Sequence, residues 1–253
     1  MNLAADPLRV LQLTDPHLFA EADATFRGRV TDESLSQVLQ HHLQSGWPAQ
    51  LVLVTGDIIQ DDTRAAYERF CRKLATLQLP VHCVPGNHDL APLMQEVLAM
   101  RPFTCCGVYE QGPWLIAGID SSEAGMAAGK VSAEELDRLD ALLQRTGAEH
   151  VLLALHHPPL PVGSQWLDQV GLLNSDEFLR IAAKSGKVRA IVFGHVHQEF
   201  AGDHASIRIL GTPSTCRQFQ VHSSEFAVDS RPPAYRRLTL HADGEIDTKI
   251  VWV

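Results

Sequence analysis

Short apolar runs that each end in a group of polar residues are the feature that most constrains the fold of this chain. Five such runs are rich in Val and Leu and have the length of a strand; they cover residues 10–13, 51–54, 81–84, 151–155 and 190–193. Largely continuous apolar runs are typical of strands buried on both faces. Open α/β sheets place their ligand sites at one edge of the sheet, so the polar groups are expected to converge there.

The polar groups are rich in Asp, Asn and His. They are Asp15-Pro16-His17, Gly56-Asp57, Gly86-Asn87-His88-Asp89, His156-His157 and Gly194-His195-Val196-His197. A lone turn or a single histidine in such a group is usually structural, but six of the thirteen histidines fall within these five groups. Nitrogen and oxygen donors without a thiolate suit hard to borderline divalent metals. The set as a whole therefore predicts a metal site.

The donors divide between two expected metals. His17 follows Asp15 by two residues and His197 follows His195 by two, so an extended backbone would place each pair on one face. Asp57 has two carboxylate oxygens and is expected to bridge both cations. The expected ligands are Asp15, His17, Asp57 and His197 for the first metal, and Asp57, Asn87, His156 and His195 for the second.

The rest of the chain alternates strands with helices and ends in strands alone. Strands are expected at 8–14, 51–55, 81–84, 114–119, 151–155, 189–193, 207–211, 216–221, 235–241 and 246–252, and helices at 31–46, 64–78, 132–145, 176–185 and from 89 onward. Thr31-Asp32 and the capping box 132–135 predict two helix starts, and residues 242–244 predict a hairpin turn. A polar loop is expected from the first strand to Arg29. This pattern favours a layered α/β sandwich forming one domain over residues 1–253.

Net charge, apolar content and cysteine count argue against several classes of protein. A net charge of -9 argues against a general nucleic-acid or membrane binder. The N-terminal residues lack the pattern of a signal peptide, and no stretch has the ~20 apolar residues of a transmembrane helix. Five cysteines without paired metal-finger spacing indicate reduced thiols, so a cytoplasmic location is expected.

The ordered motifs D-x-H, G-D, G-N-H-D, H and G-H-x-H, spanning residues 15–197, resemble those of the calcineurin-like metallophosphoesterase superfamily. The resemblance implies a four-layer α-β-β-α sandwich, in which two stacked mixed β-sheets are flanked by helices. It also implies a binuclear centre, with iron and either manganese or zinc, that binds substrate beside His17, Asp57, Asn87, His88 and His197. His88 is then the expected general acid.

Stretches outside the ligands resemble the bacterial cyclic 3′,5′-AMP phosphodiesterases of this superfamily; they are residues 14–20, 155–161, 166–169, 194–199, 212–216, 218–219 and 240–244. This narrower resemblance implies hydrolysis of cyclic AMP to 5′-AMP by in-line attack of a metal-bridging hydroxide. The implied partner is a small-molecule cyclic nucleotide, bound by a monomer or homodimer. The alternatives are hydrolysis of another phosphodiester or nucleotide pyrophosphate, and a non-catalytic scaffold, which the complete ligand set argues against.

The sequence leaves the roles of several residues open. Many relatives place an Asp three residues after the bridging Asp to steady the catalytic histidine; here that position is Gln60, which leaves the partner of His88 open. Asp89 is expected either to orient His88 or to cap a helix. Trp166 is expected either to stack on the base or to pack under its loop, and Arg217 either to pair with phosphate or to lie exposed. His157 is expected to point away from His156 as a supporting residue.

Overall fold

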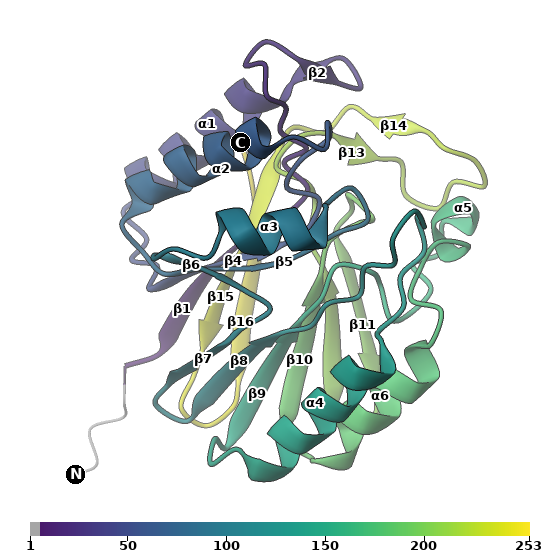
Figure 1. The fold of residues 1–253 in the computed structure, drawn as a ribbon. Coiled ribbons are helices and arrows are strands. Elements are labelled where there is room, and N and C mark those ends of the chain that lie inside the picture. The colour runs from purple at the N-terminus through teal and green to yellow at the C-terminus, as the bar shows by residue number, and fades with distance from the viewer. Residues whose placement is uncertain (1–5) are drawn as a thin grey trace.

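Two mixed six-stranded sheets form the centre of the protein in the computed structural model, which describes residues 6–253 (Figure 1). The first sheet has the order β16-β15-β1-β4-β5-β6. Its strands are β1 (Leu8–Leu13), β4 (Leu51–Thr55), β5 (Val81–Val84), β6 (Phe103–Cys105), β15 (Ala234–Leu240) and β16 (Ile246–Trp252). Strands β1, β4, β5 and β6 are parallel, and β15 and β16 extend the sheet by antiparallel pairing.

The second sheet has the order β11-β12-β10-β9-β8-β7. Its strands are β7 (Val108–Gln111), β8 (Trp114–Gly118), β9 (His150–Ala154), β10 (Val188–Phe193), β11 (Phe200–His204) and β12 (Ile207–Gly211). The four inner strands are parallel, and β7 and β11 pair antiparallel at the two edges. The sequence did not predict β6, β7 or β11, which are short or largely polar strands at sheet edges.

Helices cover the outer faces of both sheets, which confirms the predicted four-layer sandwich (Figure 1). Helices α1 (Thr31–Gln44), α2 (Arg64–Leu74) and α3 (Ala91–Val97) lie over the first sheet, and α4 (Ala133–Arg145) and α6 (Ser175–Lys184) lie over the second. A 3-10 turn (η1, Ala75–Leu77) follows α2, and a short helix α5 (Gln165–Asp168) lies in the loop after β9.

Strand β4 shows why the central runs are apolar without alternation. Leu51 and Leu53 pack between the two sheets, whereas Val52 and Val54 pack in the core beneath the helices. Both faces of the strand are therefore removed from water, and an alternating polar pattern would bury polar groups without partners.

Two small hairpins lie near the carboxyl ends of the central strands. They pair β2 (Thr25–Phe26) with β3 (Arg29–Val30), and β13 (Gln218–Phe219) with β14 (Val228–Asp229). The first replaces the polar loop expected up to Arg29, and the second reduces the strand expected at 216–221 to two residues. Strands of two residues are too short to produce a periodic pattern, so β2, β3 and β14 were not predicted.

Two helix starts were predicted from capping residues, and one is confirmed. Ser132 accepts a hydrogen bond from the backbone N–H of Glu135 at 3.1 Å, as the capping box requires. The predicted cap at Thr31-Asp32 is wrong, because Val30 is the N-cap residue and no side chain caps it; Asp32 instead pairs with Lys73 of α2. The helix expected from Asp89 begins at Ala91.

Three further expectations concern the ends and the thiols of the chain. The hairpin turn at 242–244 is confirmed, since β15 and β16 pair directly across it. All five cysteines carry free thiols. Among residues 6–253, no helix combines the length and the apolar character needed to cross a membrane.

Candidate metal centre

The five polar groups meet where the carboxyl ends of the two sheets come together. Asp15, Asp57 and Asn87 follow β1, β4 and β5 of the first sheet. His156 follows β9, and His195 and His197 follow β10, both in the second sheet. The candidate centre therefore lies between two sheets and draws donors from each, rather than lying along the edge of one sheet.

The backbone turns sharply at most of these donors. Five have a positive φ: Asp15 (52°), His17 (48°), Asp57 (50°), His195 (65°) and His197 (48°). The extended backbone that was expected for the pairs Asp15/His17 and His195/His197 is thus wrong. A left-handed conformation costs free energy for residues with a Cβ and persists where surrounding contacts enforce it. Here the loops are bonded to one another, with the Asp15 N–H donating to the Gly56 carbonyl at 3.0 Å.

The first group of donors comprises Asp15, His17, Asp57 and His197, whose candidate ligand atoms lie within 4.8 Å of one another. His17 Nε2 lies 3.1 Å from His197 Nε2 and 3.7 Å from Asp57 Oδ2. His197 Nε2 lies 3.4 Å from Asp15 Oδ1. All four side chains are buried, so water cannot satisfy them. This is the donor set expected for the first metal.

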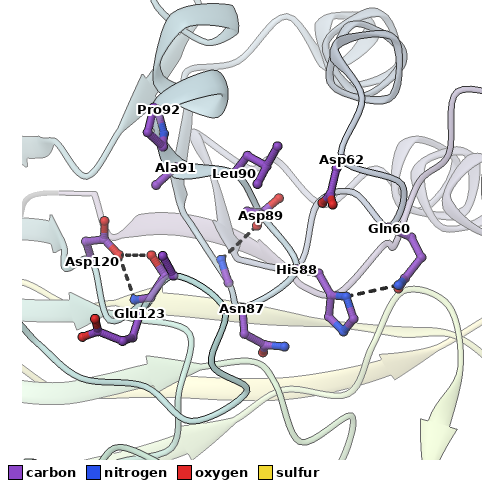
Figure 2. A pocket seen from close by; sticks show the side chains of 14 residues that line it. Gln60, Asp62, Asn87, His88, Asp89, Leu90, Ala91, Pro92, Asp120 and Glu123 are labelled. Carbon is purple, nitrogen blue, oxygen red and sulfur yellow. Dashed lines mark hydrogen bonds between the residues drawn. The ribbon is translucent and has the colours of Figure 1, made fainter.

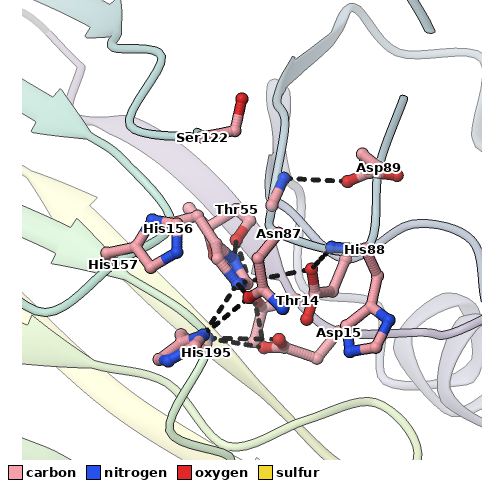
Figure 3. Close-up of polar contacts among 12 residues, drawn as sticks. Thr14, Asp15, Thr55, Asn87, His88, Asp89, Ser122, His156, His157 and His195 are labelled. Carbon is pink, nitrogen blue, oxygen red and sulfur yellow. Dashed lines mark hydrogen bonds and ion pairs between the residues drawn. The ribbon is translucent and has the colours of Figure 1, made fainter. Parts of the chain in front are cut away.

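The second group comprises Asn87, His156 and His195 (Figure 3). His195 Nδ1 lies 2.9 Å and His156 Nε2 3.2 Å from the amide oxygen of Asn87. His156 Nε2 also lies 3.4 Å from Asp57 Oδ1. One oxygen of Asp57 thus faces each group, which is the geometry that a bridging carboxylate requires.

His157 lies beside the second group, contrary to the expectation that it would point away. Strand β9 ends at Ala154, so side chains no longer alternate at 156 and 157. The rings of His157 and His195 are 4.8 Å apart, and His157 Nδ1 is 2.9 Å from the Ser121 hydroxyl. His157 is therefore a third histidine whose donor atom lies within 4.8 Å of those of His156 and His195.

The electrostatics of the site favour a cation. Burial alone would raise the pKa values of Asp15 and Asp57, but interactions with His197 and His156 outweigh burial and lower both, so both carboxyls are ionised. Burial lowers the pKa of His17 and of His195 to about 3, which leaves a lone pair on each ring. Burial opposes charge on His156 too, but Asp57 and Asp15 raise its pKa to about 9. Two buried carboxylates thus create a field that stabilises positive charge.

Two glycines let the loops approach closely. A Cβ on Gly86 would overlap the Asp57 side chain, and a Cβ on Gly56 would overlap the His156 ring. Gly56 also has a φ of +91°, which residues with a Cβ rarely adopt. The G-D and G-N-H-D motifs thus need glycine at these positions, because a larger residue would clash with the donors.

Asp89 ties two of the donor loops together. Its carboxylate accepts hydrogen bonds from the N–H groups of Gly86 at 2.9 Å and Ile58 at 3.2 Å, and from the Tyr67 hydroxyl at 3.0 Å. Burial and the nearby Asp57 raise its pKa to about 7. Neither expected role applies, since Leu90 is the N-cap of α3 and no hydrogen bond joins the Asp89 and His88 side chains within residues 6–253.

Gln60 is the partner of His88 (Figure 2). Its amide nitrogen lies 3.1 Å from His88 Nδ1, and its amide oxygen lies 2.8 Å from His17 Nδ1. The backbone of His88 donates to Asp57 Oδ1 at 2.9 Å. Gln60 therefore links the candidate acid His88 to the candidate ligand His17, and the backbone of His88 is bonded to the candidate bridging carboxylate.

A cavity of about 260 Å³ opens over the donors and is lined by His17, Asp57, Asn87, His88, His195 and His197. Phe26 stacks on His17 with ring centres 4.2 Å apart, and Phe219 stacks on His197 at 4.0 Å. Trp166 also lines the cavity, where it packs edge-on against Phe219 and Phe226 at 5.3 Å each. No sequence pattern indicated Phe26, which lies in a two-residue strand.

Arg217 lies outside the residues that line this cavity. Its Nε donates to the carbonyl of Arg27 at 3.2 Å, and its own carbonyl accepts from His197 Nδ1 at 2.5 Å. The backbone of Arg217 therefore orients a candidate ligand, while its contact with phosphate stays a prediction.

A second cavity of about 650 Å³ also has His88 and Asn87 in its lining (Figure 2). Its wall carries Asp62, Asp120 and Glu123. Approaching anions would be repelled from this side, so an anionic substrate is expected to enter by the aromatic side.

Comparison with known proteins agrees with this geometry. The family model of calcineurin-like phosphoesterases matches residues 8–199. The chain is 38% identical to the 3′,5′-cyclic adenosine monophosphate phosphodiesterase CpdA of Vibrio vulnificus, covering 98% of this chain and 91% of that protein. It is 39% identical to CpdA of Escherichia coli K12, covering 96% and 89%. A 3′,5′-cyclic-nucleotide phosphodiesterase of a Nostoc species is 37% identical, covering 96% and 92%.

The fold has a counterpart among solved structures. A dimetal phosphatase from Danio rerio superposes with a TM-score of 0.67 at 16% identity, covering 98% of this chain and 99% of that one. With the two stacked sheets, the clustered donors and the family match spanning most of its length, this chain belongs to the calcineurin-like phosphoesterase family.

Proposed function

We propose that this protein hydrolyses 3′,5′-cyclic AMP to 5′-AMP at a centre of two metal ions. The observation that carries the proposal is Asp57, whose two carboxylate oxygens each face a separate group of buried donors. The substrate is inferred from relatives that are 38% and 39% identical over nearly the whole chain and are named cyclic AMP phosphodiesterases.

The donor set fits the expected metals. Asp15, His17, Asp57 and His197 would hold one ion, and Asp57, Asn87, His156 and His195 the other. Carboxylate, amide and imidazole donors without thiolates suit iron paired with manganese or zinc. When bound, such a pair lowers the pKa of water and withdraws charge from phosphoryl oxygens.

The residues around the cavity position the substrate and supply a proton. The proposed substrate contacts His17, Asp57, Asn87, His88 and His197 all line the same cavity. A water molecule releases one proton to solvent and its oxygen bonds to phosphorus as the bond from phosphorus to O3′ breaks, and O3′ takes a proton to become a hydroxyl. We assign that proton to His88, whose ring contacts Gln60 and whose backbone N–H donates to the Asp57 carboxylate. A single acid group of this kind contributes roughly 10²–10⁴-fold to rate.

In this proposal, residues 1–253 form one domain that binds a small cyclic nucleotide, and the protein acts as a monomer or homodimer in the cytoplasm. Its main alternative within the family is a different phosphodiester or a nucleotide pyrophosphate. The scaffold alternative loses support, because the donors and His88 lie around one cavity.

A substrate panel tests the proposed function. Purified protein would be assayed with cyclic AMP, cyclic GMP, bis(p-nitrophenyl) phosphate and a dinucleotide pyrophosphate, with elemental analysis of the same sample. We expect two metal equivalents and a product that is 5′-AMP rather than 3′-AMP. Turnover of the generic diester without turnover of cyclic AMP would refute the substrate, and full turnover with one metal would refute the paired centre.

A further inference from the structure

The mouth of the metal cavity is built from two segments far apart in sequence. The turn of the β2–β3 hairpin contributes Arg27, and the segment between β13 and β14 contributes Phe226. The Arg27 guanidinium carbon lies 4.6 Å from the centre of the Phe226 ring. Both side chains line the same cavity as the candidate metal donors.

Phe226 is a fixed ring with an accessible face. Trp166 and Phe219 each meet it edge-to-face, with ring centres 5.3 Å away. The residue is nevertheless 43% exposed. The inner rings differ, because Phe26 and Phe219 already have a face covered by His17 and His197. Phe226 is therefore the exposed ring at the mouth, and the guanidinium of the exposed Arg27 side chain lies over it.

Arg27 is held above that face by its backbone. Its φ is +49° and that of Gly28 is +78°, the paired left-handed conformation of a tight two-residue hairpin turn. The Arg27 carbonyl is anchored by Arg217 Nε at 3.2 Å, whereas its own side chain is exposed. Among the described residues that line the cavity, Arg27 is the one lysine or arginine.

We propose that Phe226 and Arg27 form a clamp for the nucleobase. The base lies on the ring face that Arg27 now covers, and the guanidinium shifts outward to stack on the other face of the base. Aromatic rings and guanidinium planes are the surfaces on which bases stack, and a purine offers a larger face than a pyrimidine. The inference rests on the proposed function, since it supposes a nucleoside attached to the phosphate at the metals.

The clamp acts on binding and not on the chemical step. Neither side chain contacts His88, Asn87 or Asp57 among the interactions in residues 6–253. Loss of one stacking partner weakens nucleotide binding by roughly 5- to 150-fold. The effect is therefore expected in KM, with kcat preserved.

The test compares cyclic AMP with the same cyclic ribose phosphate lacking a base. Phe226→Ala is expected to raise KM for cyclic AMP at least fivefold, to leave kcat within twofold, and to leave the base-free substrate unaffected. Arg27→Ala should act in the same direction, and Phe226→Trp should restore the wild-type KM. Arg231→Ala is the matched control, because Arg231 lies 5.0 Å over Trp252 and outside this cavity.

The outcomes separate the two proposals. Equal changes for both substrates, or no change in KM for cyclic AMP, would overturn the clamp while leaving the proposed function intact. Absence of cyclic AMP turnover by the wild-type protein would overturn the proposed function itself. Thermal melting of each variant identifies a loss of fold, which an exposed position such as Phe226 is not expected to cause.

Discussion

Gln60 joins His17 to His88 through two hydrogen bonds of opposite polarity. A metal on His17 Nε2 requires the ring proton to be on Nδ1, where it is donated to the Gln60 oxygen. The amide NH₂ of Gln60 then faces His88 Nδ1 as a donor. This contact matches a neutral His88 ring with its proton on Nε2, whereas a carboxylate at this position would accept from a protonated Nδ1, so Gln60 holds His88 in a different protonation state from the one an Asp would favour.

Removal of the contact between Gln60 and His88 should slow protonation of the leaving group. Gln60→Ala is expected to slow hydrolysis of cyclic AMP by roughly 10–100-fold, and His88→Ala by roughly 10²–10⁴-fold. Bis(p-nitrophenyl) phosphate, whose leaving group needs little protonation, should slow much less. Metal content should stay at the wild-type level in His88→Ala; because Gln60 also bonds the candidate ligand His17, both variants are assayed at saturating metal, with Gln40→Ala on the exposed side of α1 as the matched control. Equal slowing of both substrates would contradict a role through His88.

At the scale of elements, the loops after β4 and β5 form one unit. Asp89 and the close approach of Gly86 to Asp57 hold the G-D loop against the G-N-H-D loop. The short length of these loops leaves no room for adjustment. A change in one loop should therefore displace a donor carried by the other.

Gly86→Ala tests this coupling. The added Cβ would overlap both the side chain and the backbone nitrogen of Asp57, so the loops must separate. We expect fewer than two metal equivalents by elemental analysis and a loss of about 1–3 kcal/mol in the free energy of unfolding. Gly147→Ala is the control, since nothing lies within 4 Å of its Cβ. Retention of both metals by the Gly86 variant would show that the contact is not needed.

At the scale of the whole molecule, the candidate centre links the two sheets. The first sheet provides the carboxylates and Asn87, and the second provides three of the histidines. Ions bound there would hold the sheets together and neutralise buried negative charge. Ligands that bind only the folded state raise its stability by mass action.

Metal removal should accordingly lower the thermal stability. At a free metal concentration about 100 times Kd, metal binding adds about 2.7 kcal/mol to the free energy of unfolding. This corresponds to roughly 5–10 °C in Tm for a chain of this size. Calorimetry before and after chelation measures the shift, and added metal should restore it. Asp57→Ala should melt at a temperature that is insensitive to chelator; an equal shift in that variant would argue against Asp57 as the shared ligand.

The sequence by itself determined the central strands and the donor set. Strands buried on both faces must be largely apolar, so 51–55 and 81–84 were located to the residue. The groups after them follow from the same pattern, because function at strand ends needs polar residues where burial stops. The order of the motifs was then enough to predict the four-layer sandwich and the family.

Only the tertiary structure decided how the donors and the cavity are arranged. The left-handed backbone at Asp15 and His197, the partner of His88 and the contacts of Asp89 depend on loops brought together from different strands. Arg27 and Phe226 are separated by almost 200 residues and meet at the mouth. Local sequence patterns indicate burial and backbone preference. Contacts between distant segments form only when those segments pack, so periodicity in the chain does not predict them.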